Sequence, residues 1–287
     1  MAWKWTERAE KTVAVMTIAA VMVVLGCHSR VSSRDSSATQ QPTTQTQQPQ
    51  GEEPPAARAG NSEAAAKVQG EPAFQGIPLS HWLKQLRSEE ADKRKEALRA
   101  ISAIGPAAKE AIPEVRKLLQ DPDEDVQEWA CSTLGRIGEA AKVAIPDLEK
   151  IILNRQAADK VRWAAAVALG NIGPVAVSAT PTLLKALQDS DPWLRWAATE
   201  GLSGIGPQAQ GAAQALAEAL YDTEYIVRIG AARALVHVAP QVKQQPKVVS
   251  ALIRCYEDSS QYDSVRQKVA EAIKAAEPGL AAKLGIK

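Results

Sequence analysis

Small and apolar residues recur at helical spacing in the segment 159–174. They stand one residue before Arg162 and three, seven and ten residues after it. These offsets place the side chains on one face of a helix with 3.6 residues per turn. The pattern therefore predicts a helix that buries one face and leaves the opposite face polar.

Close copies of this segment recur before and after it: with the segment itself there are five at a spacing of 33 to 35 residues, and a sixth, looser copy lies near the C-terminus. A fixed period of this length indicates a repeat architecture. The column that Arg162 occupies holds, in chain order, Arg94, Gln127, Arg162, Arg195, Arg228 and Arg266.

Each copy is followed by signals for a stop and a second helix. Gly followed by Pro, as at Gly173 and Pro174, ends the first helix, because Gly accepts the left-handed conformation and Pro cannot continue the hydrogen-bond ladder. A second helix is predicted to begin near Pro113, Pro146 and Pro181, where Pro suits the first turn. Each repeat is thus a helical hairpin, and the hairpins must stack to bury their apolar stripes.

From about Ile77 to the C-terminus, these residues resemble the HEAT and HEAT-like repeats, of the short class also found in phycobilisome lyase-type proteins. The resemblance rests on the helix from Asp159 through Gly173 and on the Ala-Ile-Pro opening of the next unit. It implies an all-α, armadillo-like α-solenoid, a right-handed superhelix of about six hairpins. It also implies that one helix of each hairpin, here the helix with the Arg column, lines the concave surface, and that the chain is a binding scaffold.

Residues 1–27 are interpreted as a targeting segment. A basic start precedes an apolar run of thirteen residues, 13–25, which is shorter than the roughly 20 that span a bilayer. The run closes at Cys27 in a sequence that resembles the lipobox of a bacterial lipoprotein signal peptide. An uncleaved membrane anchor is the alternative. Lipidation of Cys27 would hold the repeats on the envelope side, facing the periplasm or the exterior. His28 and not Asp follows the Cys, which favours attachment to the outer membrane over the inner membrane.

Residues 28–75 are rich in Ser, Thr, Gln, Pro, Ala and Gly and have almost no large apolar residue. Such a segment cannot bury enough surface to fold, so we expect a disordered tether. The repeat domain is then expected to span residues 76–287.

The composition excludes several kinds of function. With 34 Lys and Arg against 33 Asp and Glu, the chain is no nucleic-acid polycation. Cys131 and Cys255 lie in different repeats, too far apart for a disulfide, and His237 has no His or Cys at metal-ligand spacing. We expect no cofactor, no metal and no catalytic residue, and the Gly residues follow the repeat pattern.

The Arg column, which comprises Arg94, Arg162, Arg195, Arg228 and Arg266, has two interpretations. It could bind anions such as nucleic acid. Alternatively it is a structural ladder that pairs with acidic residues at the start of the same or next helix. The acidic residues expected for this are Asp125, Asp159, Asp191 and Glu224.

Trp residues are concentrated on one predicted face of the central repeats. The position after the Arg column should point away from the core, and it holds Trp163, Trp196 and Ile229 in three adjacent repeats. Val167 extends this stripe, Trp193 borders it, and Gly170 and Ser203 are expected to leave room around it. An exposed aromatic patch marks recognition, whereas strong curvature would bury these rings between repeats.

The sequence therefore predicts a monomeric scaffold that binds a protein or peptide on its concave face. A bilin-lyase-like or other enzyme-associated role is the first alternative, and nucleic-acid binding through the Arg column is the second.

Overall fold

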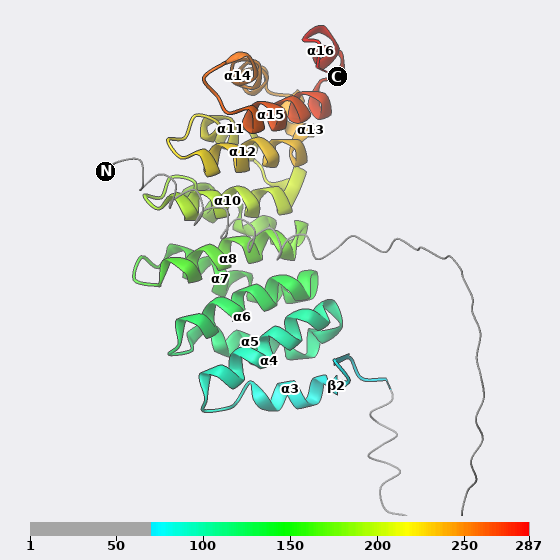
Figure 1. Ribbon diagram of the computed structural model, residues 1–287, viewed down its shortest axis with the longest axis vertical. Helices are drawn as coiled ribbons and strands as arrows, with labels where there is room; N and C mark the ends of the chain where they lie inside the picture. Colours follow the sequence, from blue (N-terminus) through cyan, green and yellow to red (C-terminus); the bar gives the residue numbers. More distant parts are fainter. Residues whose placement is uncertain (1–69, 287) are drawn as a thin grey trace, which may run out of the picture. The chain divides into compact units, whose positions relative to one another are not determined.

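The structure, a computed structural model, describes residues 70–286. Residues 1–69 and 287 lie outside the described residues, and with them the predictions of a signal peptide, of lipidation at Cys27 and of most of the tether. The described part consists of six pairs of a short helix and a longer one, stacked in sequence order from cyan to red in Figure 1. It is an all-α solenoid, as predicted.

The six pairs have the following bounds in chain order: α3 (Leu79–Gln85) with α4 (Ala91–Ile104), α5 (Ile112–Lys117) with α6 (Glu124–Ile137), α7 (Ile145–Leu153) with α8 (Asp159–Ile172), α9 (Thr180–Ala186) with α10 (Pro192–Ile205), α11 (Ala212–Ala219) with α12 (Tyr225–His237), and α14 (Pro246–Glu257) with α15 (Asp263–Ala276). Two short helices, α13 (Ala239–Lys243) and α16 (Pro278–Lys283), follow α12 and α15. The long helices carry the Arg column.

The glycines that were predicted to end the long helices do end them. Gly105, Gly138, Gly173 and Gly206 follow directly after long helices and have φ between 67° and 90°. This backbone region favours glycine, so the chain can leave the helix there without strain. Pro then lies in the first turn of α5, α7 and α9.

Short 3-10 segments fill the connection between one pair and the next, and the sequence pattern did not predict them. They are η1 (Gly105–Ala111), η3 (Gly138–Ala144), η4 (Pro174–Ala179) and η5 (Gly206–Gln208); a further one, η2 (Leu118–Gln120), ends the second short helix. Small buried residues such as Ala108, Ala141 and Ala176 let these turns lie on the core.

A two-stranded antiparallel hairpin precedes the first helix. Strand β1 (Ala73–Phe74) pairs with β2 (Ile77–Pro78), and the ring of Phe74 lies 6.5 Å from that of Trp82 in α3. The tether was expected to run to residue 75, but Phe74 has an apolar partner and so joins the folded part. The hairpin covers the N-terminal end of the core.

One continuous core runs through all six pairs, from Leu79 to Ala281. The two columns predicted to face it are buried throughout. These are the Ala column, Ala97, Ala130, Ala165, Ala198, Ala231 and Val269, and the Leu column, Ile101, Leu134, Leu169, Leu202, Leu235 and Ile273.

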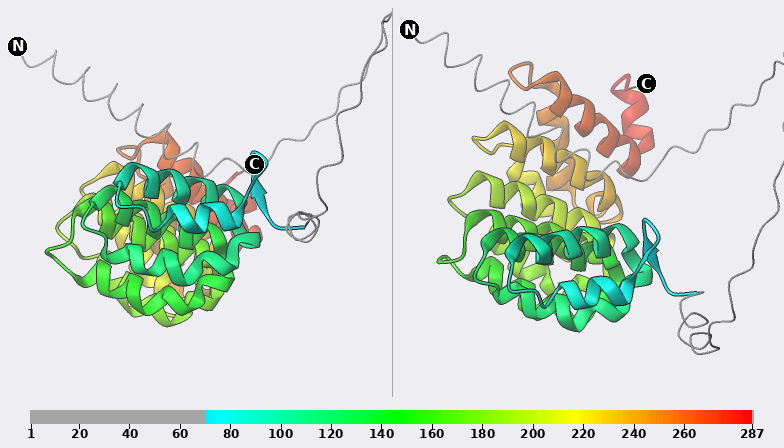
Figure 2. Two further views of the ribbon diagram at one scale, coloured as in Figure 1. Left: turned by 90° about the horizontal axis from the view of Figure 1, so that it is seen from below. Right: turned by 60° about the horizontal axis from the view of Figure 1, so that its bottom comes forward.

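The long helices pack more closely on one another than the short helices do. Glycines permit this approach, because a Cβ at Gly170 in α8 would lie 2.7 Å from the carbonyl oxygen of Glu200 in α10. Because the inner layer of a curved stack has the shorter path, we expect this closer-packed layer of long helices to line the concave face. Figure 2 shows the same helices from two further directions. Within residues 70–286, helices that are both long and apolar enough to span a bilayer do not occur.

Candidate functional site

The guanidinium groups of the Arg column are bound to backbone carbonyls. Arg94 Nη1 donates to Ser88 O, six residues earlier, at 2.9 Å, and Arg195 and Arg228 make the equivalent bond at 3.0 and 2.8 Å. Arg162 and Arg266 donate instead to the carbonyl ten residues earlier, Ile152 O in α7 and Tyr256 O in α14. These bonds hold each long helix to the end of the short helix before it.

Three members of the column also pair with an Asp 27 residues later. Arg94 binds Asp121 at 2.7 Å, Arg162 binds Asp189 at 2.7 Å, and Arg195 binds Asp222 through two bonds of 2.8 Å. Each Asp stands in the loop before the next long helix and also accepts the backbone N–H two residues on. The column therefore ties one repeat to the next.

The acidic partners expected from the sequence were wrong, apart from a long contact of 3.9 Å between Arg162 and Asp159. Asp125 pairs with Lys160 and Lys95, and Asp191 accepts the N–H groups of Trp193 and Leu194 at the start of α10. An acid at the start of a helix satisfies the free N–H groups of its own first turn. The acid that pairs with the guanidinium lies earlier in the loop, two residues before Asp191 and Glu224 and four before Asp125.

Burial and pairing together set the charge state of these acids. Burial raises the pKa of Asp222, but the hydrogen bonds from Arg195 and from the Glu224 N–H outweigh it, so the pKa lies below its usual range. The pKa of Asp189 is lowered in the same way, against burial, by Arg162 and the Asp191 N–H. Arg94, Arg162 and Arg195 are thus neutralised by these loop acids, and Arg266 makes an exposed ion pair of 3.6 Å with Asp263. Four of the five guanidinium groups are therefore paired within the described chain, which disfavours the column as a binding surface for nucleic acid.

At the C-terminal end, the column lies against aromatic rings. Arg228 stands 5.6 Å from the ring centre of Tyr262, and Arg266 stands 5.9 Å from that of Tyr256. Tyr225 contacts Tyr262 edge to face, with ring centres 4.7 Å apart. The sequence pattern did not indicate this Tyr cluster, because Tyr225 lies in the fifth helical pair whereas Tyr256 and Tyr262 lie in the looser sixth copy.

Three of the predicted Trp side chains do come together. The ring centres of Trp163 and Trp193 are 5.9 Å apart, and those of Trp193 and Trp196 are 6.2 Å apart in an edge-to-face arrangement. The Trp163 indole N–H donates to Asp191, which also caps α10. We call Trp163, Trp193 and Trp196 the Trp cluster.

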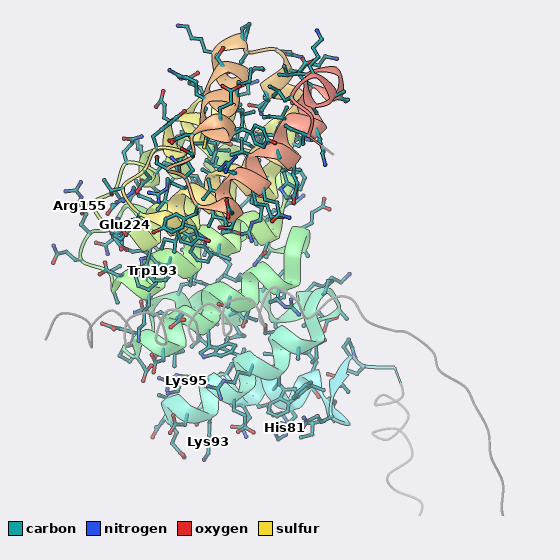
Figure 3. All side chains as sticks on the ribbon, turned by 45° about the horizontal axis from the view of Figure 1, so that its top comes forward. His81, Lys93, Lys95, Arg155, Trp193 and Glu224 are labelled. Atoms are coloured by element: carbon teal, nitrogen blue, oxygen red, sulfur yellow. The ribbon has the colours of Figure 1, made fainter. Side chains whose placement is uncertain are left out.

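The Trp cluster lies where the long helices begin. In Figure 3, Trp193 stands on the same edge as Arg155 and Glu224, which belong to loops that precede long helices. All three rings are half-buried: Trp163 and Trp196 pack against the core, whereas Trp193 contacts the other two rings. The Trp cluster is thus neither a fully exposed patch nor fully buried between repeats, which were the two alternatives expected from the sequence.

Ile229 and Val167 are also half-buried and pack against the core. Trp196 reaches α12, where a Cβ on Gly230 would lie 3.1 Å from its Cδ1 atom. Gly170, which was expected to leave room in a groove, is instead buried under α10. Close helix packing has taken that space.

Groups suited to catalysis or metal binding are sparse. Across residues 70–286, no three His, Cys, Asp or Glu side chains come together as a metal site would require. Cys131 and Cys255 are buried free thiols. His237 Nδ1 lies 2.9 Å from Ser203 Oγ on an exposed helix end.

A family model described as HEAT repeats matches residues 79–170 and 145–236, which together span more than half of the chain. The chain belongs to the HEAT-repeat family. No curated protein matches its sequence. The HEAT-repeat assignment agrees with the six stacked helical pairs and with the columns that run through them.

Solved structures share this HEAT-repeat architecture. An engineered protein is 25% identical, with a TM-score of 0.53 over 70% of this chain and 97% of its own. A designed armadillo repeat protein in complex with the peptide (KR)4 is 22% identical, with a TM-score of 0.55 over 69% and 99%. Kap121p bound to Ste12p is 18% identical, with a TM-score of 0.55 over 73% of this chain and 24% of that one. At these identities the last two show the fold alone.

Proposed function

We propose that this HEAT-repeat protein is a non-enzymatic scaffold that binds a protein or peptide on its inner face, at the Trp cluster. The observation that carries the proposal is the cluster itself. Three large rings from two adjacent helices are contiguous and only half-buried. Trp is among the residues that contribute most to binding energy at protein interfaces, and contiguous apolar surface is rarely left open without a partner.

The architecture supports a ligand of this class. Stacked helical pairs present an extended inner surface, on which a partner can contact several repeats at once. One structurally similar protein is described in complex with a peptide, and another is described as bound to Ste12p. For the present chain, a protein or peptide partner is a proposal that rests on the Trp cluster and on this common architecture.

We further propose that a lipid on Cys27 anchors the protein in the bacterial envelope, in the outer membrane rather than the inner, as a monomer. The support is the basic start, the apolar run of residues 13–25 and the lipobox-like ending at Cys27. The test is detergent phase partition of the full chain and of Cys27→Ser. We expect the natural chain in the detergent phase and the variant in the aqueous phase. Aqueous partition of both would disprove lipidation.

The binding surface is tested with the full chain, extracted in detergent and used to capture envelope proteins. The variant Trp163→Ala/Trp196→Ala is compared with Val143→Ala/Leu153→Ala, whose side chains are each 51% exposed and lie in other elements. We expect the Trp variant to lose a partner that the control variant keeps. Both proteins must first show cooperative unfolding at similar denaturant concentrations.

Because Trp163 and Trp196 also pack on the core, Trp193→Ala serves as a second variant. Trp193 contacts the other two rings, so its removal should reduce binding with less effect on stability. If all variants are folded and keep every captured partner, the Trp cluster is not the binding surface and the proposal is wrong.

A further inference from the structure

The proposed binding surface has an acidic neighbour on α6. Lys160 of α8 donates to Asp125 of α6, which shows which residues of the two helices lie side by side. Further along, Gly135 of α6 lies beneath Ala168 of α8, so the two helices run parallel. Glu128 and Trp163 each stand three residues, about one turn, after the Lys160–Asp125 pair. They therefore occupy neighbouring positions on the inner face.

Glu128 is exceptional among the acids of the long helices. Three Glu side chains on these helices are half-buried, and two of them have cationic partners: Glu200 pairs with Arg233, and Glu271 pairs with Lys268. In the part of the chain that the structure describes, Glu128 makes no ion pair and accepts no hydrogen bond. Lys160 is the nearest cation by helical position, and it is already engaged by Asp125 and Glu124.

This carboxylate is costly to keep charged. Burial raises the pKa of Glu128 above its usual range, while Lys160 opposes the rise and Asp125 adds to it. A half-buried acid without a counter-ion is therefore a position where an incoming cation gains more than it would at a fully exposed acid.

The surroundings add negative charge of the same sign. The segment 121–128 before and at the start of α6 holds five acidic residues. Asp121, Glu124 and Asp125 are paired with cations of the chain, whereas Asp123 caps α6 and has no ion pair among the described residues. Aromatic rings attract cations through their faces, and the effect is strongest for Trp. An acid without a partner beside Trp rings thus matches a cation carried on an apolar stem, which is the chemistry of a Lys or Arg side chain.

We propose that the surface formed by Glu128 and the Trp cluster binds an extended basic segment of a protein partner, with one Lys or Arg side chain between Glu128 and Trp163. This inference rests on the proposed function and specifies its ligand. Apolar side chains of the segment would lie on Trp193 and Trp196. Asp123, the other acid of the segment 121–128 without an ion pair among the described residues, would attract a further basic residue.

The test is fluorescence anisotropy with the full chain in detergent and a fluorescein-labelled peptide of four Lys-Ser repeats. A peptide of four Glu-Ser repeats is the probe control. We expect saturable binding of the Lys peptide, none of the Glu peptide, and a change in Trp fluorescence on binding. The variant Glu128→Gln should bind the Lys peptide about tenfold more weakly, since a charge-assisted contact of this kind is lost.

The matched control variant is Glu110→Gln, which removes an exposed acid in η1. Its affinity for the Lys peptide should not change. Glu128→Gln removes a charge that burial disfavours, so we expect it to be at least as stable as the natural chain. A loss of binding in this variant is therefore not a loss of fold.

Two results would overturn the inference. If the two Gln variants bind the Lys peptide equally, the attraction is diffuse and no cation is held at Glu128. If the Lys peptide fails to bind while a captured partner still depends on Trp163 and Trp196, the binding surface stands but its ligand is not basic. Loss of the dependence on the Trp cluster would instead disprove the proposed function.

Discussion

Arg195 and Asp222 form a two-bond ion pair that joins the fourth helical pair to the fifth. The Nε–Oδ2 and Nη2–Oδ1 distances are both 2.8 Å, and the two side chains are 13% and 12% exposed. Arg195 also donates to the Asp189 and Ser190 carbonyls, so one guanidinium holds a loop on either side of it. Such a pair fixes the spacing between two repeats and also stabilises the fold.

Breaking this pair on one side should be costly. In Asp222→Asn, Arg195 is left largely buried without a counter-charge, and we expect a loss on the order of 3 kcal/mol in the free energy of unfolding. Urea denaturation measures it. Lys93→Gln, which removes an exposed pair with Glu90, should cost less than about 1 kcal/mol. Equal effects of the two variants would contradict a special role for the buried pair.

The same pair predicts sensitivity to acid. The pKa of Asp222 in the folded chain lies below its ordinary value of 3.8, because Arg195 and the Glu224 N–H outweigh the effect of burial. A lowered pKa stabilises the fold above the unfolded value and loses this contribution as the pH falls through the folded value. The stability difference between the natural chain and Asp222→Asn should therefore be full at pH 6 and shrink below about pH 4. Denaturation curves at several pH values measure it, and a difference that is constant with pH would contradict this assignment.

One interval of the ladder has no charges at either end. Gln127 stands in the Arg column and donates to the Asp121 carbonyl, and Asn154, 27 residues later, accepts the Gln156 N–H as the loop Asp residues do. Gln127→Arg combined with Asn154→Asp should rebuild the ion pair. We expect a coupling free energy of about 1 to 3 kcal/mol in a double-mutant cycle of unfolding. Additive effects would mean that the loop after α7 holds the side chain of residue 154 out of reach of residue 127.

The sequence was sufficient for the repeats and insufficient for the contacts between them. The buried columns around Arg162 and the stop at Gly173 depend on neighbours within one helix, so local spacing determines them. The pairing of Arg195 with Asp222, in contrast, depends on how a loop of the next repeat folds back. For this reason the acids at the starts of helices were chosen wrongly.

The burial of the Trp cluster likewise could not be predicted from the sequence alone. Helical spacing placed Trp163 and Trp196 opposite the core, but how far they are covered depends on the distance between α8, α10 and α12. That distance is set by glycines such as Gly170. Nothing in the sequence of α8 itself indicates that the backbone of α10 lies so close to this glycine. Asp191 stands two residues before Trp193 in the sequence, which could have indicated a contact with the Trp cluster. It was instead interpreted as a partner for an Arg of the column.

Gly170 should therefore be sensitive to substitution. A methyl group there would meet the Glu200 carbonyl and the Gly201 Cα at 2.7 and 2.9 Å, which forces α8 and α10 apart. The helix would gain roughly 0.5 to 1 kcal/mol from Ala, but overpacking typically costs 1 to 3 kcal/mol. We expect Gly170→Ala to lose stability in urea denaturation. Gly279→Ala, in α16 with nothing within 4 Å, should be neutral or slightly stabilising. A tolerated Gly170→Ala would mean that the inner layer can widen freely.

The two buried thiols can report how the stack unfolds. Cys131 lies in the second pair and Cys255 in the sixth, both fully buried, and burial raises the pKa of Cys131 strongly and that of Cys255 to about 11. In a Cys27→Ser chain these are the remaining two of the three Cys. We expect neither to react with a maleimide at pH 7 in the native state, since the thiolate is the reactive form.

In rising urea, Cys255 should react before Cys131, because each repeat contacts only its neighbours and the terminal repeats open at lower cost. Mass spectrometry of the labelled chain assigns each thiol. Labelling of Cys255 in the absence of urea would contradict its burial in α14. Simultaneous labelling of both thiols would mean that the ion pairs between repeats, with Arg195–Asp222 among them, couple all six helical pairs into one cooperative unit.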